Sequence, residues 1–242
     1  MRIVAVSPHL DDAAFSVGGV LARLADAGHD VTVATVFTAS VPDPSGFALA
    51  CQTDKGIAAD VDYLALRRGE DVDAMRVLGV GHAHLGLPEA PHRGYDSPAA
   101  LFAGVRPGDR LDLLPHRTAL DADVLLAPQG LGGHVDHLLV VAAVAALGRP
   151  TAWWRDAPYV LRQPDADPSP GLPSGLQPLP LLGHAARRAD ACACYTTQLP
   201  YQFGRDSDLP PAEAMRSAMA RLDDVLLADD DTAALLRQAL SC

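Results

Sequence analysis

The N-terminal part of the chain alternates short apolar runs with a segment of helical periodicity. Residues 2–6 and 31–37 are β-branched runs, and residues 13–27 have helical spacing that stops at Gly28. Continuous apolar runs are typical of strands covered on both faces of a sheet, and glycine is typical of a helix C-terminus. Strand, helix and strand in this order predict a right-handed βαβ unit with parallel strands.

The same patterns recur along the rest of the chain. Short apolar runs predict further strands at residues 83–87, 123–128 and 152–154. Helical spacing predicts helices at residues 60–78, 135–147, 185–197, 211–228 and 231–240. Stretches rich in proline and glycine predict loops at residues 41–55, 88–98 and 163–180. The charged residues of the 60–78 helix predict a solvated face, formed by Arg67, Arg68, Glu70, Asp71 and Asp73.

Strands that alternate with helices predict an α/β fold: a Rossmann-like, doubly wound, mostly parallel sheet with helices on both faces. A length of 242 residues fits one domain better than two, and we expect that domain to span residues 1–242. If the strand order is 3-2-1-4-5, the loops after the first and fourth strands flank the point where the order reverses. Ligands of such sheets bind at that point.

Composition narrows the classes of function. An apolar fraction of 49% is enough for a core and excludes global disorder. A formal charge of −11 disfavours nucleic acid and anionic membranes as partners. The chain has no signal-like segment and no apolar run long enough for a membrane span, so we expect a soluble, cytoplasmic protein. The four cysteines are too few and too scattered for a disulfide framework: Cys51, Cys192, Cys194 and Cys242.

Two clusters of histidine and aspartate follow the first and fourth predicted strands. The first is His9-Leu10-Asp11-Asp12 and the second is His134-Val135-Asp136-His137. Two imidazoles and one carboxylate would bind a catalytic zinc and leave a position for water, whereas Mg²⁺ and Ca²⁺ prefer sites built of oxygen. The alternative is that Asp11 and Asp12 only cap a helix and that the histidines lie on the surface. The meeting of both clusters at one sheet edge favours the metal site.

With these motifs the sequence resembles the PIG-L/LmbE family of zinc-dependent N-acetyl-sugar deacetylases over nearly its whole length. The family pattern Pro-His-Pro-Asp-Asp-Glu is present as residues 8–13, with Leu10 and Ala13 as departures, and His-x-Asp-His is intact at residues 134–137. Weaker matches to the family pattern lie at residues 67–79, 156–159 and 195–198. Neither departure lies at a position that the family uses as a metal ligand, so the resemblance implies activity and leaves the subfamily and the substrate open.

The resemblance implies a role for each motif residue. His9, Asp12 and His137 would ligate Zn²⁺, with Fe²⁺ as the alternative metal. Asp11 would be the general base that activates the attacking water and later protonates the leaving amine. His134 would support the oxyanion as a cation or a donor, and Asp136 would orient an imidazole. Three residues on segments expected to rim the crevice are candidates for substrate binding, and loop position favours the last two: Arg68, His92 and Arg93.

The leading hypothesis is a metal-dependent hydrolase that removes the acetyl group from an N-acetyl amino sugar or its glycoside, a small-molecule partner. One alternative is a thiol-conjugate amidase of the same family, which would use the same groups. Another is a noncatalytic sugar- or metal-binding module, against which the unligated carboxylate of Asp11 argues. A dehydrogenase or methyltransferase lacks the glycine fingerprint after the first strand. The oligomeric state is left open.

Overall fold

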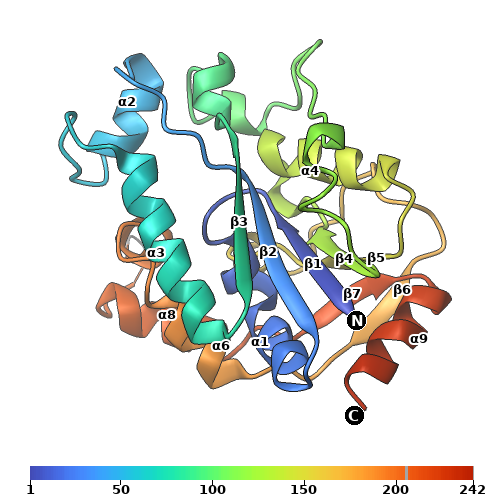
Figure 1. The fold of residues 1–242 in the computed structure, drawn as a ribbon. Helices are drawn as coiled ribbons and strands as arrows, with labels where there is room; N and C mark the ends of the chain where they lie inside the picture. The colour runs from blue at the N-terminus through green and yellow to red at the C-terminus, as the bar shows by residue number, and fades with distance from the viewer. Residues whose placement is uncertain (205–206, 242) are drawn as a thin grey trace.

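The structure, a computed structural model, describes residues 1–204 and 207–241. Within this part seven strands form one sheet in the order β3-β2-β1-β4-β5-β7-β6 (Figure 1). The strands are β1 (Arg2–Ser7), β2 (Asp30–Phe37), β3 (Gly81–Leu87), β4 (Val124–Pro128), β5 (Thr151–Trp154), β6 (Gln177–Pro180) and β7 (Val225–Ala228). The α-helices are α1 (Asp12–Asp26), α2 (Gly46–Thr53), α3 (Tyr63–Leu78), α4 (Val135–Ala146), α5 (Tyr159–Arg162), α6 (Ala185–Cys192), α7 (Leu199–Phe203), α8 (Pro211–Met219) and α9 (Asp230–Ala239).

The first five strands are parallel and have the order 3-2-1-4-5, which confirms the predicted α/β fold. The sheet then continues with two antiparallel strands, because β7 pairs with β5 and β6 pairs with β7. These strands correct two predictions: β7 lies in the 211–228 segment predicted as helix, and β6 lies in the predicted 163–180 loop. Each has only four residues, and its pairing is with strands far away in sequence.

Two apolar cores lie on the two faces of the sheet. Alternate residues of β1 divide between them: Ile3 and Ala5 face one core, and Val4 and Val6 face the other. The first core includes α1, α3, α6, α8 and α9, whereas the second includes α4 and the segment around Leu113 and Leu120. β1 is therefore covered on both faces, as its unbroken apolar run predicts.

Helix α2 corrects a further prediction, because it lies in the 41–55 stretch that was expected to be a loop. Pro42 and Pro44 precede the helix and do not interrupt it. Its buried residue, Gln52, donates hydrogen bonds to the backbone oxygens of Ala58 and Val61. These bonds hold the turn that leads into α3, which begins at Tyr63 rather than at residue 60.

The prediction of a solvated charged face on α3 is wrong for three of its residues. Arg67, Glu70 and Asp71 are buried, and each has partners that lie far away in sequence. Glu70 accepts hydrogen bonds from the hydroxyl groups and one backbone N–H of the 196–197 turn, at 2.7–2.8 Å. Asp71 accepts one from the Tyr195 hydroxyl at 2.8 Å. Burial is tolerated because each charge is hydrogen-bonded.

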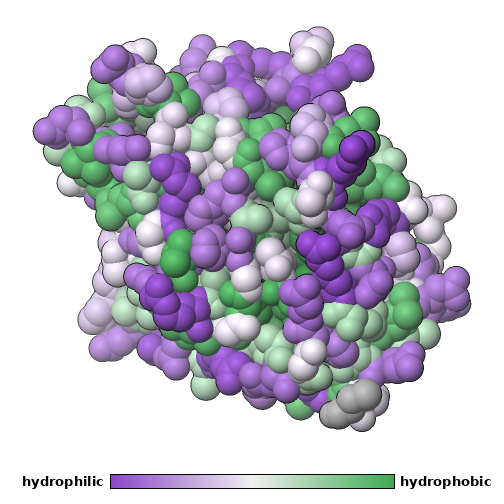
Figure 2. All heavy atoms as spheres, viewed as in Figure 1, coloured by the Kyte–Doolittle hydropathy of each residue, from purple (hydrophilic) through white to green (hydrophobic). Residues whose placement is uncertain are grey.

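In Figure 2 hydrophilic residues cover much of the visible face and apolar residues occur in small groups between them. Among the described residues, no helix has both the length and the apolar character needed to cross a membrane. Cys51, Cys192 and Cys194 are free thiols, as expected without a disulfide framework. Cys242 lies outside the described residues.

Candidate active site

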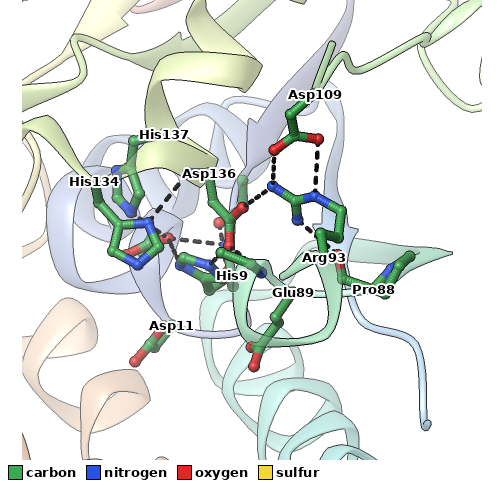
Figure 3. Close-up of polar contacts among 12 residues, drawn as sticks. His9, Asp11, Pro88, Glu89, Arg93, Asp109, His134, Asp136 and His137 are labelled. Atoms are coloured by element: carbon green, nitrogen blue, oxygen red, sulfur yellow. Dashed lines mark hydrogen bonds and ion pairs between the residues drawn. The ribbon is translucent and has the colours of Figure 1, made fainter. Parts of the chain in front are cut away.

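The two histidine and aspartate clusters lie together at the edge where the parallel strands end (Figure 3). Residues 9–12 follow β1, and residues 134–137 follow β4 and begin α4. Because β1 and β4 are paired neighbours, their carboxyl ends open into one crevice. The loop before His134 is tightly folded, with Gly132 at a φ of 81°. A Cβ atom at this position would overlap the ring of Tyr159, so both the backbone and the space require glycine.

Two of the three predicted ligands, the imidazoles, converge on a carboxylate oxygen of the third. Asp12 Oδ2 lies 3.2 Å from His9 Nδ1 and 3.3 Å from His137 Nε2. The backbone N–H of His9 also donates to this oxygen at 2.9 Å and fixes the carboxylate at the start of α1. The three side chains offer donor atoms that lie within 4.8 Å of one another. The fold therefore brings together the donors that the sequence predicts.

In each imidazole the inner nitrogen is the one near Asp12, and the outer nitrogen is the one on the opposite side of the ring. Both outer nitrogens contact carboxylates. His9 Nε2 lies 2.9 Å from Asp136 Oδ2, and His137 Nδ1 lies 2.6 Å from Asp156 Oδ1. A carboxylate accepts, so each outer nitrogen carries a proton and each inner nitrogen can present a lone pair. Carboxylates that support histidines in this way are typical of metal sites. The arrangement fits zinc, which is commonly bound by imidazole and carboxylate together.

A second set of donors, from His9, His134 and Asp136, also lies within 4.8 Å. Two of its members already have partners within the protein. Asp136 contacts Arg93 at 2.7 Å and accepts a bond from the backbone N–H of Ala90 at 3.1 Å, while His134 Nδ1 accepts one from the backbone N–H of Asp136. We therefore favour the set made by His9, Asp12 and His137.

Burial and neighbouring charges shift the pKa values of His9, Asp12 and His137 in opposite directions. Burial lowers the pKa of His137, but Asp12 and Asp156 outweigh it and raise that pKa to about 9. The pKa of His9 is likewise raised well above its usual value, because hydrogen bonds to Asp12 and Asp136 outweigh burial. Burial would raise the pKa of Asp12, yet His137 and His9 hold it well below the ordinary range. A divalent cation bound here would take the place of the inner protons.

Asp11 lies beside this set, and its carboxylate belongs to neither group of metal donors. Its Oδ1 accepts a hydrogen bond from Arg67 Nη2 at 3.4 Å, and Arg67 Nη1 contacts Glu89 at 2.7 Å. Figure 3 shows the Asp11 carboxylate apart from that of Asp136. Burial raises the pKa of Asp11 to about 6 although Arg67 lowers it. A carboxylate in this range is suited to accept a proton near neutral pH.

His134 lies edge-on to His9, with ring centroids 5.1 Å apart. Its Nδ1 accepts the backbone N–H of Asp136 at 3.2 Å, so in the neutral ring the proton is on Nε2. Burial, aided by the charge of His9, lowers the pKa of His134 to about 3. Of the two states expected for His134, cation or donor, these contacts favour the neutral donor.

The three residues predicted to contact substrate are not among the described residues that line the cleft in front of the donors. Arg68 donates to the backbone oxygen of Thr38 at 2.6 Å and to the Ser40 hydroxyl at 3.0 Å. His92 lines a neighbouring cavity of about 400 Å³ between α2 and the start of α3. Arg93 pairs with carboxylates behind the site. Both guanidinium groups are directed at acceptors of the protein itself.

The cleft in front of the donors has a volume of about 290 Å³, close to the lower end for small-molecule sites. Aromatic side chains form much of its wall: Phe47, Tyr63, Phe102, Tyr159 and Tyr201. Lys55, the only lysine of the chain, also lines it. Its ammonium lies 5.2 Å from the ring centroid of Tyr63 and 5.0 Å from that of Tyr201. The cleft thus combines flat apolar walls with charged groups at its base.

Three residues of this site have no role in it assigned from the sequence, although two of them lie in the weaker family matches: Arg67, Glu89 and Asp156. Asp156 follows the end of β5, so its place at the same sheet edge was a usable signal. Arg67 has the helical spacing of the buried residues Leu64 and Met75, which indicates an inward position despite its charge. Glu89 lies two residues after β3, and only its contact with Arg67 distinguishes it.

Comparisons with known proteins identify the family of the chain. Residues 4–147 match the sequence model of the PIG-L family, described as GlcNAc-PI de-N-acetylase. A 2'-N-acetylparomamine deacetylase of Streptomyces fradiae is 36% identical over 168 residues, which cover 65% of this chain and 57% of that protein. A 1D-myo-inositol 2-acetamido-2-deoxy-alpha-D-glucopyranoside deacetylase of Corynebacterium kroppenstedtii is 31% identical over 172 residues, or 62% of this chain and 42% of that protein. The chain therefore spans about half the length of these curated relatives.

A crystal structure with the same fold covers nearly the whole chain. It is that of the A40926 pseudoaglycone deacetylase Dbv21, which is 31% identical and superposes with a TM-score of 0.73. The superposition covers 94% of this chain and 96% of that one. The family match includes both histidine and aspartate clusters and more than half of the chain. This chain belongs to the PIG-L family.

Proposed function

We propose that this chain is a metal-dependent deacetylase that hydrolyses the acetamide of an N-acetylated amino sugar or of a glycoside of one. The observation that carries the proposal is the set of His9, Asp12 and His137, in which carboxylates hold both outer imidazole nitrogens, beside the separate carboxylate of Asp11. Family membership supports it, as do relatives that are named for the deacetylation of such compounds.

Zinc would be held by His9 Nδ1, a carboxylate oxygen of Asp12 and His137 Nε2, with Fe²⁺ as the alternative. When bound to three protein ligands, it supplies a Lewis acid that polarises the acyl group and lowers the pKa of water. Asp136 and Asp156 hold the two imidazoles so that the inner nitrogens face the Asp12 carboxylate, where both would be available as ligands.

Asp11 would take the proton from the water that attacks the acetyl carbon. When the C–N bond breaks, the same carboxyl group would return that proton to the leaving amine, so that acetate and the free amino sugar are formed. Arg67 holds one oxygen of Asp11 and is itself held by Glu89. This pair keeps Asp11 beside the donors.

His134 would donate its Nε2 proton to the oxyanion that develops on the acyl oxygen. Its other nitrogen is fixed by the backbone N–H of Asp136, so the ring is oriented before substrate binds. A single pre-oriented donor of this kind typically contributes about 10²–10³ in kcat. Because the ring stays neutral, the contribution would not depend on the titration of His134 near neutral pH.

The size and lining of the cleft support the proposal that one sugar ring of the substrate lies next to the donors. Its volume is about 290 Å³, and the rings of Phe102 and Tyr159 lie next to the catalytic histidines. The C-terminal half of the chain supplies Tyr159 and Gln198 to the same cleft, so we propose that residues 1–242 form one catalytic domain. We also propose a cytoplasmic location, where free thiols persist.

Two measurements on purified protein test the proposal. Metal analysis should find about one zinc or iron per chain, lost in His137→Ala and kept in His82→Ala, whose histidine is exposed on β3. A panel of N-acetylated amino sugars and their glycosides should release free acetate. Hydrolysis of thiol conjugates in a second panel, without release of acetate from the sugars, would indicate the amidase reaction of the family. Binding of the sugars without any hydrolysis would indicate a noncatalytic module. A metal-replete protein without stoichiometric metal would overturn the scheme.

A further inference from the structure

We propose that Arg93 is a positioning residue: it holds Asp136, and through Asp136 the ring of His9, in the orientation that the metal donors need. The inference rests on the proposed metal site and is independent of which sugar is the substrate. It also gives a role to a side chain that the sequence suggested as a substrate contact.

The contacts run in one line from Arg93 to the donor set. Arg93 Nη2 lies 2.7 Å from Asp136 Oδ1, and Asp136 Oδ2 lies 2.9 Å from His9 Nε2 (Figure 3). The side chain of Asp136 is completely buried. His9 presents its opposite nitrogen, Nδ1, to Asp12. The two oxygens of Asp136 thus connect a fixed cation on one side to a predicted ligand on the other.

Arg93 is itself held from several directions. Its Nε and Nη2 pair with the two oxygens of Asp109 at 3.2 and 3.1 Å, and Nη1 donates to the backbone oxygen of Pro88 at 2.8 Å. The guanidinium lies 4.7 Å from the ring centroid of Phe37. Asp109 also accepts a hydrogen bond from the Tyr95 hydroxyl at 2.9 Å. A guanidinium anchored in this way fixes the carboxylate in front of it with little freedom.

Removal of Arg93 would leave a buried carboxylate with one oxygen unpaired, an arrangement that proteins rarely tolerate. Asp136 would keep contacts only on Oδ2, from His9 and the backbone N–H of Ala90, and a carboxylate held at one oxygen would fix the ring of His9 less firmly. Loss of such an outer partner typically weakens metal binding by about 10- to 100-fold. The expected defect is therefore in metal affinity and not only in turnover.

Arg106 offers a matched control, because it lies in the same loop as Asp109, the partner of Arg93. Its side chain contacts the backbone oxygen of Gly94, forms an ion pair with Asp96 and lies 4.8 Å from the ring centroid of Tyr95. These contacts belong to the loop that carries Asp109 and do not include Asp136. Arg106→Met therefore disturbs the loop and leaves the link from Arg93 to Asp136 in place.

The test measures the dissociation constant of Zn²⁺ by competition with a chelator. Arg93→Met should bind zinc about 10- to 100-fold more weakly than the parent, Arg93→Lys should be intermediate, and Arg106→Met should be unchanged. Parental affinity in Arg93→Met, or equal weakening in Arg106→Met, overturns the inference and leaves the proposed function standing. A parent protein that binds no zinc overturns the proposed function and this inference with it.

A second readout does not depend on affinity. In protein loaded with Co²⁺, the His9 Nε2 and His137 Nδ1 protons should give shifted, slowly exchanging NMR signals. Arg93→Met should speed exchange at His9 and leave His137 unchanged; unchanged exchange at both overturns the inference.

If Arg93→Met does not fold, Arg93→Lys and Asp109→Asn decide, because each removes part of the contacts that hold Arg93 between Asp109 and Asp136. Weakened zinc binding in both supports the inference, and parental affinity in both overturns it.

Discussion

Two clusters of buried charge in this chain are built in different ways. In the first, which we call the α6 cluster, Arg188 lies 2.7 Å from Asp224 and donates to the backbone oxygens of Met219 and Leu222 at 2.8 and 3.0 Å. The Arg188 side chain is 1% exposed. One cation meets one anion through Nη1, neutral acceptors take Nη2, and Nε has no hydrogen-bond partner among the described residues. The α6 cluster is thus nearly complete within the protein.

The second is the edge cluster, formed by His9, Asp12, Asp136, His137 and Asp156. Here two imidazoles face one oxygen of Asp12, and two further carboxylates occupy their outer nitrogens. Carboxylates outnumber permanent cations, and the inner donors face one another. Buried charge can therefore serve either stability or binding. Substitution in the α6 cluster should cost stability, whereas substitution at the edge should cost function.

The largest effect is expected for Asp11→Asn, which removes the proposed base with almost no change in shape. We expect kcat to fall by about 10²–10⁴-fold while metal content and the unfolding midpoint stay parental. Turnover assays, metal analysis and denaturation of the same preparation measure all three. The control is Asp73→Asn, an exposed residue of α3 paired with Arg76. Hydrolysis at the parental rate in Asp11→Asn would show that the base is elsewhere.

The parallel half of the sheet and the meeting of the two clusters could be predicted because local sequence determines them. β-branched runs mark β1 and β2, and the switch-point rule then places residues 9–12 beside residues 134–137. Parts of the fold that depend on distant partners could not be predicted. β7 has four apolar residues inside a segment that looks helical, and only its pairing with β5 and β6 makes it a strand.

The features of the site that could not be predicted from the sequence also depend on distant partners. The sequence predicts the donors from their spacing, and the spacing of Arg67 indicates an inward position, but nothing in the sequence identifies Asp11 as its partner. Arg93 was predicted as a substrate contact from its loop position, and the loop instead folds so that Asp109 and Asp136 both pair with it. The partners of buried charges come from other elements, and a single sequence does not identify them.

Arg188→Met tests the other side of the comparison. Breaking a buried ion pair typically costs about 3–5 kcal/mol, because Asp224 Oδ1 and two backbone oxygens lose a donor. The denaturant midpoint should therefore fall strongly, while kcat per folded molecule and zinc content stay near parental values. A loss of turnover without a loss of stability would show that the two clusters are not separate in function.

Tyr195→Phe should have a smaller effect of the same kind. The Tyr195 hydroxyl donates to Asp71 at 2.8 Å in a buried contact between the C-terminal part and α3. Its removal leaves Asp71 with His84 as a remaining partner at 2.8 Å. We expect a loss of about 1–3 kcal/mol in the free energy of unfolding, since a buried acceptor loses one bond. Chemical denaturation measures this loss, and parental stability would mean that His84 alone satisfies Asp71.

The smallest effect is expected for Asp62→Ala at the start of α3, the helix that carries both Arg67 and Asp71. Asp62 accepts from the Ser40 hydroxyl at 2.7 Å and from the backbone N–H of Ala65 at 2.9 Å. These bonds, that of Ser40 first, hold the pKa of Asp62 below its ordinary value. Loss of such a cap costs about 1 kcal/mol at neutral pH.

The same substitution makes a prediction about pH. Because the folded pKa of Asp62 is lowered, its contribution is complete above the unfolded pKa of about 4 and disappears as the pH falls through the folded value. Parent and Asp62→Ala should therefore differ in unfolding free energy at pH 7 and converge in acid, while kcat stays parental at neutral pH. Asp62→Asn, which can still cap, should lose less. A fall in kcat in Asp62→Ala would mean that the α3 cap also sets the position of Arg67 beside Asp11, which would join the stability of this helix to the function of the edge cluster.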